Sequence, residues 1–302
     1  MTNAATPGSP TEPVATAAVS SLFIYPVKSC RRVEVDHATV SSAGIVGDRQ
    51  WQVAAGKRPR TQRQQTVMAT VQPTLIDGGI RLTAPGAGTV EVAKPTGTDH
   101  VTGSIVGATV EVGDAGDEAA AWFAKLLDDD DARLYAITDQ QVQVPPGWDH
   151  FGPSIGFPDL APVLLTNTAS LDWLLERSSE PFDMHRFRPN IVVSGAEPFA
   201  EDTWLRFNVG QAELSASLPW ARCPMPQIDQ DDGTRHREPA KVLKAHRWCT
   251  SAPTLNSQFA AITENHAVFG IGSAIQPAGA VISTGDQVVV SDYQAPLIAR
   301  PA

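Results

Sequence analysis

The chain has 302 residues, of which 42% are hydrophobic and 19% are charged. This composition predicts a globular protein with a sizeable core, and the length favours two domains over a single large one. The net charge of -10 argues against broad nucleic-acid binding, because such an interface needs a basic face to neutralise phosphates. No run of the sequence approaches the ~20 apolar residues that a membrane-spanning helix requires.

The cysteines argue against a disulfide framework, since there are only three and they lie far apart, at Cys30, Cys223 and Cys249. No C-x-x-C pair is present, which leaves a structural zinc site or an iron–sulfur cluster without support. Residues 1–18 are rich in Ala, Thr, Pro and Ser and lack the features of a signal peptide, so we expect a disordered lead-in. The expected compartment is the reducing cytoplasm.

Residues 19–137 have the pattern of a β-rich domain. Gly and Pro interrupt short apolar runs at close intervals, as in a sheet or a barrel. One helix is predicted over Asp117–Leu127, because its apolar residues recur on one face. The predicted strands are Ser20–Tyr25, Val33–Thr39, Trp51–Ala54, Val67–Val71, Ile80–Thr83, Val90–Val92 and Thr109–Val112.

Residues 138–302 continue the β pattern after a predicted linker, Gln140–Pro158, that is rich in Pro, Gly and polar residues. Two helices are predicted, Ala169–Glu176 with Thr168 as its N-cap and Pro239–His246. The predicted strands are Val163–Thr166, Ile191–Val193, a hairpin over Trp204–Leu218, Phe269–Ile275, Ala280–Ile282 and Gln287–Val290. The fold class is therefore mainly β with some α (α+β), with two β-barrel-like domains at 19–137 and 138–302.

A candidate metal ligand lies at Cys223, which follows Arg222 in a segment bounded by Pro219 and Pro224. Prolines on both sides indicate a fixed loop. A neighbouring arginine favours the thiolate form of a cysteine, and the thiolate is the form that ligates soft metals. The alternative is a buried cysteine that acts as a small hydrophobic residue, and these residues alone favour that alternative.

Candidate anion-binding residues occur in both halves. Lys28 and Ser29 directly follow a predicted strand and offer a positive charge and a hydroxyl donor to a phosphate. Arg49 follows a predicted turn and Arg63 lies in a polar loop, and both could add bidentate contacts. The alternative for each is an ordinary solvated charge. The common nucleotide-binding, protease and esterase motifs are absent from the sequence, and the seven histidines show no ligand spacing.

Several segments, taken in order, resemble one known family. LFIYPVKSCRRVEVDHATVSSAGIVGDRQW and TQRQQTVMATVQP resemble the N-terminal β-barrel domain that precedes molybdenum-cofactor-sulfurase C-terminal (MOSC) domains. RFRPNIVVSGAEPFAEDTW, VGQAELSASLPWARCPMPQID and EPAKVLKAHR resemble the MOSC domain itself. The resemblance runs from about Val19 to Tyr293, and the architecture is similar to that of the mitochondrial amidoxime-reducing components and their bacterial counterparts. The sequence departs from the family pattern at Trp220–Ala221 and Pro224–Gln227, which we expect on the substrate side.

The resemblance implies a molybdenum–molybdopterin cofactor (Moco) in a cleft between the two domains. Cys223 matches the family's molybdenum ligand and would be the catalytic centre of the protein. Lys28 and Arg49 would lie on one wall of the cleft and Cys223 on the other. The residues expected to bind the cofactor are Lys28, Ser29, Arg49, Arg63, Asp159, Arg188, Asn190 and Arg222.

The resemblance also implies a function: an oxidoreductase that reduces N-hydroxylated or N-oxygenated small molecules. Three cysteines are too few for an iron–sulfur cluster, so the electrons would come from a separate ferredoxin- or cytochrome-like protein with its reductase. No nucleic-acid or membrane partner is expected. Two alternatives stay open, a sulfur carrier or transferase that uses a Cys223 persulfide, and a non-catalytic carrier of the cofactor.

Overall fold

The structure is a computed structural model and describes residues 17–56, 58–96, 100–105, 108–138, 157, 160–255 and 257–299. The predicted linker Gln140–Pro158 lies outside the described residues except for Phe157, as does most of the predicted lead-in. Across the described part of the chain, no helix combines the length and the hydropathy needed to cross a membrane.

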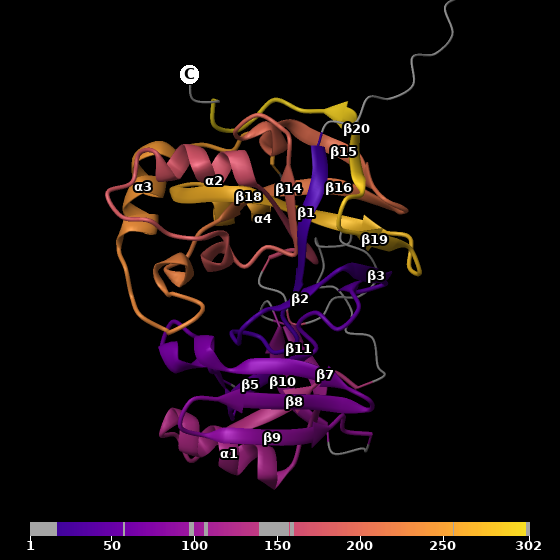
Figure 1. Ribbon diagram of the computed structural model, residues 1–302, viewed down its shortest axis with the longest axis vertical. Coiled ribbons are helices and arrows are strands. Elements are labelled where there is room, and N and C mark those ends of the chain that lie inside the picture. Colours follow the sequence, from indigo (N-terminus) through magenta and orange to yellow (C-terminus); the bar gives the residue numbers. More distant parts are fainter. Residues whose placement is uncertain are drawn as a thin grey trace, which may run out of the picture.

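A nine-stranded sheet forms the upper part of the molecule, and seven of its strands close into a barrel (Figure 1). The barrel order is β13, β14, β1, β20, β15, β16 and β18, and β18 returns to β13. Trp204, Phe207 and Leu214 belong to its buried core. The strands of this sheet are β1 (Ala17–Ile24), β2 (Val33–Val35), β13 (Val163–Asn167), β14 (Ile191–Ser194), β15 (Trp204–Val209), β16 (Ala212–Ala221), β17 (Trp248–Cys249), β18 (His266–Gln276) and β20 (Gln287–Tyr293).

The first strand of the chain lies inside this upper sheet, between strands from the C-terminal half (Figure 1). β1 pairs antiparallel with β14, with Leu22 opposite Ile191, and also pairs with β20. A small sheet also combines strands from both halves of the chain, because β3 (His37–Ser41) pairs with both β4 (Gly44–Ile45) and β19 (Val281–Ser283). The two halves of the chain are therefore interleaved, and the domain limits of 19–137 and 138–302 stay predictions.

The lower part of the molecule contains two further sheets, the helix α1 and the 3-10 turn η1 (Figure 1). Helix α1 (Asp117–Leu127) covers a separate buried core through residues such as Trp122 and Phe123. The strand order of the first sheet is β10, β11, β12, β5 and β6, and that of the second is β7, β8 and β9. Their limits are β5 (Trp51–Ala55), β6 (Arg58–Pro59), β7 (Gln72–Ile76), β8 (Gly79–Ala84), β9 (Gly88–Ala93), β10 (His100–Ile105), β11 (Ala108–Asp114) and β12 (Ala132–Ala136).

Helices and 3-10 turns cover the outside of the upper barrel (Figure 1). An aromatic cluster that includes Phe23, Phe187 and Phe269 packs between the barrel and these elements. The helices are α2 (Thr168–Leu175), α3 (Glu238–His246) and α4 (Ser257–Thr263), and the 3-10 turns are η3 (Met184–Phe187), η4 (Ala200–Thr203) and η5 (Met225–Gln227). A further 3-10 turn, η1 (Thr66–Thr70), belongs to the lower part.

The predicted fold class, mainly β with some α, is confirmed, but several predicted elements differ. The predicted strand Val67–Val71 is wrong, because the 3-10 turn η1 occupies it and buries the consecutive residues Met68 and Ala69. Met68 packs in the lower core, whereas Ala69 packs against Met225 and Ile228, and the hydrogen bond from the Val71 amide to the Met68 carbonyl closes the turn. The predicted strand Val33–Thr39 breaks at Asp36, whose carbonyl accepts a hydrogen bond from the Thr284 amide.

Three further differences concern the C-terminal half. The N-cap of α2 is Asn167 instead of Thr168, since the Asn167 side chain accepts a hydrogen bond from the Ala169 amide at 3.1 Å. The predicted hairpin is confirmed, but β16 continues through Pro219 to Ala221 and delivers Cys223 directly past its end. Helix α4 and strand β17 were not predicted.

Candidate cofactor and active site

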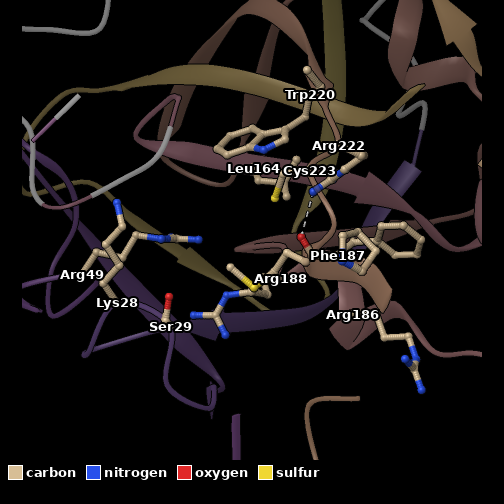
Figure 2. Close-up of a pocket in the computed structure, with 13 residues that line it drawn as sticks. Lys28, Ser29, Arg49, Leu164, Arg186, Phe187, Arg188, Trp220, Arg222 and Cys223 are labelled. Atoms are coloured by element: carbon tan, nitrogen blue, oxygen red, sulfur yellow. Dashed lines mark hydrogen bonds between the residues drawn. The ribbon is translucent and has the colours of Figure 1, made fainter. Parts of the chain in front are cut away.

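One pocket lies between the loops that carry Lys28, Ser29 and Arg49 and the end of β16. Most of the predicted site residues line it. Figure 2 shows Lys28, Ser29 and Arg49 on one side and Trp220, Arg222 and Cys223 on the other. The described residues that line it are Lys28, Ser29, Arg49, Leu164, Arg186, Phe187, Arg188, Trp220, Ala221, Arg222, Cys223, Met225 and Pro226.

The first wall is a pair of loops held in an unusual backbone conformation. Ser29, with φ of 65°, and Arg49, with φ of 48°, both lie in the left-handed region that non-glycine residues rarely adopt. The Lys28 amide donates to the Trp51 carbonyl at 2.7 Å, and the Arg49 amide donates to the Tyr25 carbonyl at 2.8 Å. Such conformations persist only where surrounding contacts enforce them, and they concentrate at functional sites.

Arg49 is fixed in this wall by buried polar partners. Its guanidinium pairs with the neighbouring Asp48 carboxylate and donates to the Asn190 side-chain oxygen at 3.2 Å. Asn190, predicted as a cofactor contact, is itself buried behind the pocket and donates to the Phe23 carbonyl at 3.2 Å. Asn190 therefore positions Arg49 from behind.

Tyr25 lies between the two arginines of this side. The guanidinium of Arg188 lies 4.1 Å, and that of Arg49 5.0 Å, from the centre of the Tyr25 ring. Burial raises the pKa of Tyr25 to about 12, with a smaller opposing effect of Arg188, so the ring stays neutral. Its hydroxyl donates to the Pro189 carbonyl at 3.2 Å. A neutral aromatic face stabilises both cations without cancelling their charge.

Arg188 reaches the pocket from the segment before β14, with a left-handed φ of 55°. Its guanidinium donates to the Cys30 carbonyl at 2.6 Å and to the Gln230 side-chain oxygen at 3.0 Å. Gln230 in turn exchanges two hydrogen bonds with Gln62, at 2.9 and 3.0 Å. This chain of contacts ties loops from both halves of the sequence to the pocket.

The second wall begins where β16 ends. The Arg222 guanidinium donates from Nη1 to the Phe187 carbonyl at 3.1 Å (Figure 2). It also donates from Nε to the Phe269 carbonyl at 3.0 Å. Burial lowers the pKa of Arg222 to about 9, and the nearby Cys223 partly opposes this effect, so the guanidinium keeps its charge at neutral pH. Arg222 therefore holds the Cys223 loop in place and adds positive charge beside the thiol.

Cys223 is the exposed cysteine of the chain, whereas Cys30 and Cys249 are buried. The alternative prediction of a buried, small hydrophobic residue therefore describes Cys30 and Cys249 but is wrong for Cys223. Burial raises the pKa of the Cys30 thiol to about 12, which keeps it protonated and unreactive. The exposed position suits Cys223 to bind a partner in the pocket.

The structure does not bring every predicted residue to this pocket. Arg63 is exposed on its turn, where its Nε lies 3.5 Å from the Thr61 hydroxyl, and it is absent from the described lining. Asp159 lies outside the described residues. The placements of Lys28, Ser29, Arg49, Arg188, Arg222 and Cys223 are those that the sequence led us to expect, and their roles stay predictions.

Sequence reasoning missed Arg186, which belongs to the lining although its guanidinium points away from the Cys223 side (Figure 2). It is buried and donates to the Asp229 carboxylate at 2.6 Å, while its Nε and Nη1 atoms have no hydrogen-bond partner. Tyr25 and Asp48 were also missed. The only local signal was the spacing of two arginines in the segment RFRPN.

The pocket fits a multiply anionic group held by one thiolate. Its described lining contains five lysine or arginine residues and no aspartate or glutamate, in a protein of net charge -10. Within the described part of the chain, no three potential metal ligands cluster together, so a metal here would take one protein ligand and complete its coordination from a bound organic group.

Comparison with known proteins identifies the class that this fold and pocket define. Residues 16–130 match the MOSC N-terminal beta barrel domain and residues 149–289 match the MOSC domain. The chain therefore belongs to the family of proteins that join these two domains. Among its relatives, mitochondrial amidoxime reducing component 2 of Bos taurus is 32% identical over 283 residues, which cover 89% of this chain and 82% of that protein.

A second relative supports the same assignment. Mitochondrial amidoxime-reducing component 1 of Homo sapiens is 31% identical over 249 residues, covering 76% of this chain and 72% of that protein. Among solved structures, the YUAD protein from Bacillus subtilis aligns with 92% of this chain and 97% of its own, at 14% identity and a TM-score of 0.39.

Proposed function

We propose that the chain is a molybdenum-cofactor-dependent oxidoreductase that reduces N-hydroxylated or N-oxygenated small molecules. The observation that carries the proposal is the exposed thiol of Cys223 in one pocket with Lys28, Ser29 and Arg49. The relatives named as amidoxime-reducing components support amidoximes as the first substrates to examine.

The residues divide into a metal ligand and a set of anion contacts. Cys223 would bind the molybdenum, since a thiolate is a suitable ligand for a soft metal. Lys28 and Ser29 offer a charge and a hydroxyl to the pterin phosphate, and Arg49 and Arg188 add planar donors that suit a phosphate or a heterocycle. Their backbone and side-chain contacts hold these donors in place before the cofactor arrives.

The reaction has a simple balance. An amidoxime gains two electrons and two protons, its N–O bond breaks, and an amidine and water are released. When bound, the cofactor supplies the two electrons, and a separate electron-transfer protein with its reductase restores them. The protein's own residues bind and orient the substrate beside Cys223. A cytoplasmic location is part of the proposal.

The exposed Cys223 thiol also favours a second candidate, a sulfur carrier or transferase that holds a persulfide. A third candidate is a non-catalytic carrier that binds the cofactor for delivery. The reductase is favoured over both because the relatives that match most of the chain carry the name of a reductive component.

The proposal is tested by turnover of benzamidoxime to benzamidine, with reduced methyl viologen as the electron source and protein from a host that makes the cofactor. We expect the wild type to form benzamidine and Cys223→Ser to lose more than about 100-fold of the rate, since changes even outside a metal's ligands cost 10–100-fold. Cys249→Ser is the matched control, because a hydroxyl keeps the contact of Cys249 with the Ser251 carbonyl.

One outcome would contradict the role of Cys223, and two others would contradict the reductase assignment. Wild-type turnover by molybdenum-replete Cys223→Ser would refute the ligand role. A cofactor-loaded wild type without turnover of any N-oxygenated compound would favour the carrier. A cofactor-free protein in which mass spectrometry finds one added sulfur atom on Cys223 would favour sulfur transfer.

A further inference from the structure

A second pocket adjoins the first and shares Arg222, Cys223 and Pro226 with it. The rest of its described lining comes mainly from α3, the two-residue strand β17 and the start of β18. Cys223 therefore borders both pockets. A group held by the thiol in the first pocket would be next to a molecule in the second.

The second pocket has an aromatic rim and an apolar wall. Trp248 is 38% exposed, although a large aromatic side chain is normally buried, and Leu243 forms part of the wall. The ammonium of Lys244 lies 5.8 Å from the centre of the Trp248 ring. An exposed indole beside a hollow is suited to stack on a flat aromatic molecule.

The backbone around Trp248 is fixed before any ligand binds. Trp248 pairs with Ala267 in the β17–β18 ladder, and the Arg247 amide donates to the Leu243 carbonyl at 2.7 Å. The buried Arg247 guanidinium is ion-paired with Asp202. The backbone that carries the indole is therefore preorganised, which reduces the entropy lost when a ligand binds.

The charge of this pocket contrasts with that of the protein. Its described lining includes Lys244, Arg222 and His266 but no aspartate or glutamate, whereas the whole chain carries a net charge of -10. An anionic substituent would gain from the field of Lys244, and a cationic one would lose. Charge complementarity thus favours a neutral or acidic aromatic molecule.

We propose that this second pocket binds the substrate, and that the preferred substrates are flat aromatic N-hydroxylated compounds with an acidic substituent. The aromatic ring stacks on Trp248, the acidic group lies near Lys244, and the N-hydroxyl group faces Cys223. The inference rests on the proposed reductase function for the identity of the reacting group. The preference for an acidic aromatic molecule rests on the pocket alone.

The test compares two probes, benzamidoxime and 4-carboxybenzamidoxime, by calorimetric titration of cofactor-loaded protein. In the wild type the acid should bind more tightly than the neutral compound. Lys244→Glu should weaken binding of the acid by about tenfold and change the neutral compound by less than about twofold. Trp248→Ala should weaken both by about tenfold, while Trp248→Phe should keep most of the affinity. Lys125→Glu, an exposed change of equal charge on α1, is the control and should alter neither.

The inference and the proposed function fail in different ways. Binding that follows this pattern without any turnover would reject the reductase and retain the pocket. Turnover with a KM that Trp248→Ala and Lys244→Glu both leave unchanged would retain the reductase and overturn the pocket. Failure of the wild type to bind either probe, or equal losses with Lys125→Glu, would also overturn it.

Discussion

Asp48 supports the first wall of the pocket through two buried contacts. Its carboxylate accepts the Tyr25 amide at 2.7 Å and pairs with the Arg49 guanidinium. Asp48→Ala would leave a buried amide and a buried cation without this partner, so we expect unfolding free energy to fall by about 3 kcal/mol. Chemical denaturation measures the loss.

Two further variants separate the loss of the buried Asp48 contacts from the loss of a charge at the surface. Asp48→Asn should cost less than Asp48→Ala, because an amide oxygen still accepts from Tyr25. Asp231→Ala removes an exposed partner of Arg31 and should cost less than about 1 kcal/mol. Equal losses for Asp48→Ala and Asp231→Ala would contradict the buried role of Asp48.

At the scale of single residues, the sequence predicted the charged groups of the pocket better than their support. Cations such as Lys28 and Arg222 were identified from motif order, and the structure brings them to one pocket. Tyr25 carried no such signal, because its role depends on Arg188, which is 163 positions away. The left-handed conformations of Ser29 and Arg49 also have no local sequence signature.

Gly270 links strand geometry to the second wall of the pocket. Its φ is 74°, and an added Cβ would lie 2.6 Å from the Leu165 carbonyl oxygen in the neighbouring strand β13. We expect Gly270→Ala to lower the unfolding free energy by about 3 kcal/mol, from backbone strain together with the clash. It should also displace the Phe269 carbonyl that accepts from Arg222.

The matched control for this strand is Gly86, in the turn between β8 and β9. It has a similar φ of 76°, but an added Cβ would meet nothing within 4 Å. Gly86→Ala should therefore lower the unfolding free energy only by the cost of a left-handed backbone conformation, about 1 kcal/mol. Equal thermal shifts for the two variants would show that the close approach of β13 and β18 is not what requires Gly270.

At the scale of elements, the sequence predicted best those segments in which the spacing of apolar residues repeats over several turns. Helix α1 has the predicted limits, because 11 residues give three turns of consistent apolar spacing. The short run Val67–Val71 was misassigned, since five apolar or small residues do not separate a strand from a 3-10 turn. The two-residue strand β17 is too short to have any period of its own.

Glu201 makes the stability of the whole molecule depend on pH. It is fully buried and accepts hydrogen bonds from Ser170 and Asn167. Burial, and then the adjacent Asp202 charge, raise the pKa of Glu201 from 4.5 to about 7, so the folded state holds a proton that the unfolded state releases. The stability that protonated Glu201 contributes to the folded state is fully present below pH 4.5. It is lost as the pH rises through about 7.

Glu201→Gln should remove this dependence. Between pH 4.5 and 8 the unfolding free energy of the variant should rise relative to the wild type by about 3 kcal/mol, since one pKa unit corresponds to about 1.4 kcal/mol. Denaturation of both proteins across this range measures the difference. A difference that stays constant with pH would contradict the raised pKa of Glu201.

The arrangement of the whole molecule was predictable only in outline. The class of fold and the presence of two β-rich parts followed from spacing and resemblance. The position of β1 did not, because pairing of Leu22 with Ile191 joins residues that no local period relates. This long-range pairing brings the Lys28 loop to the end of β16, so the pocket depends on the interleaving of the two halves.

The central claim is that Cys223 holds molybdenum in this pocket. Elemental mass spectrometry of protein from a host that makes the cofactor tests it most directly, with wild type, Cys223→Ser and Cys249→Ser compared side by side. The account predicts near-stoichiometric molybdenum in the wild type and in Cys249→Ser, and its loss from Cys223→Ser. Equal molybdenum in all three proteins would contradict the ligand assignment, and its absence from a folded wild type would contradict the cofactor itself.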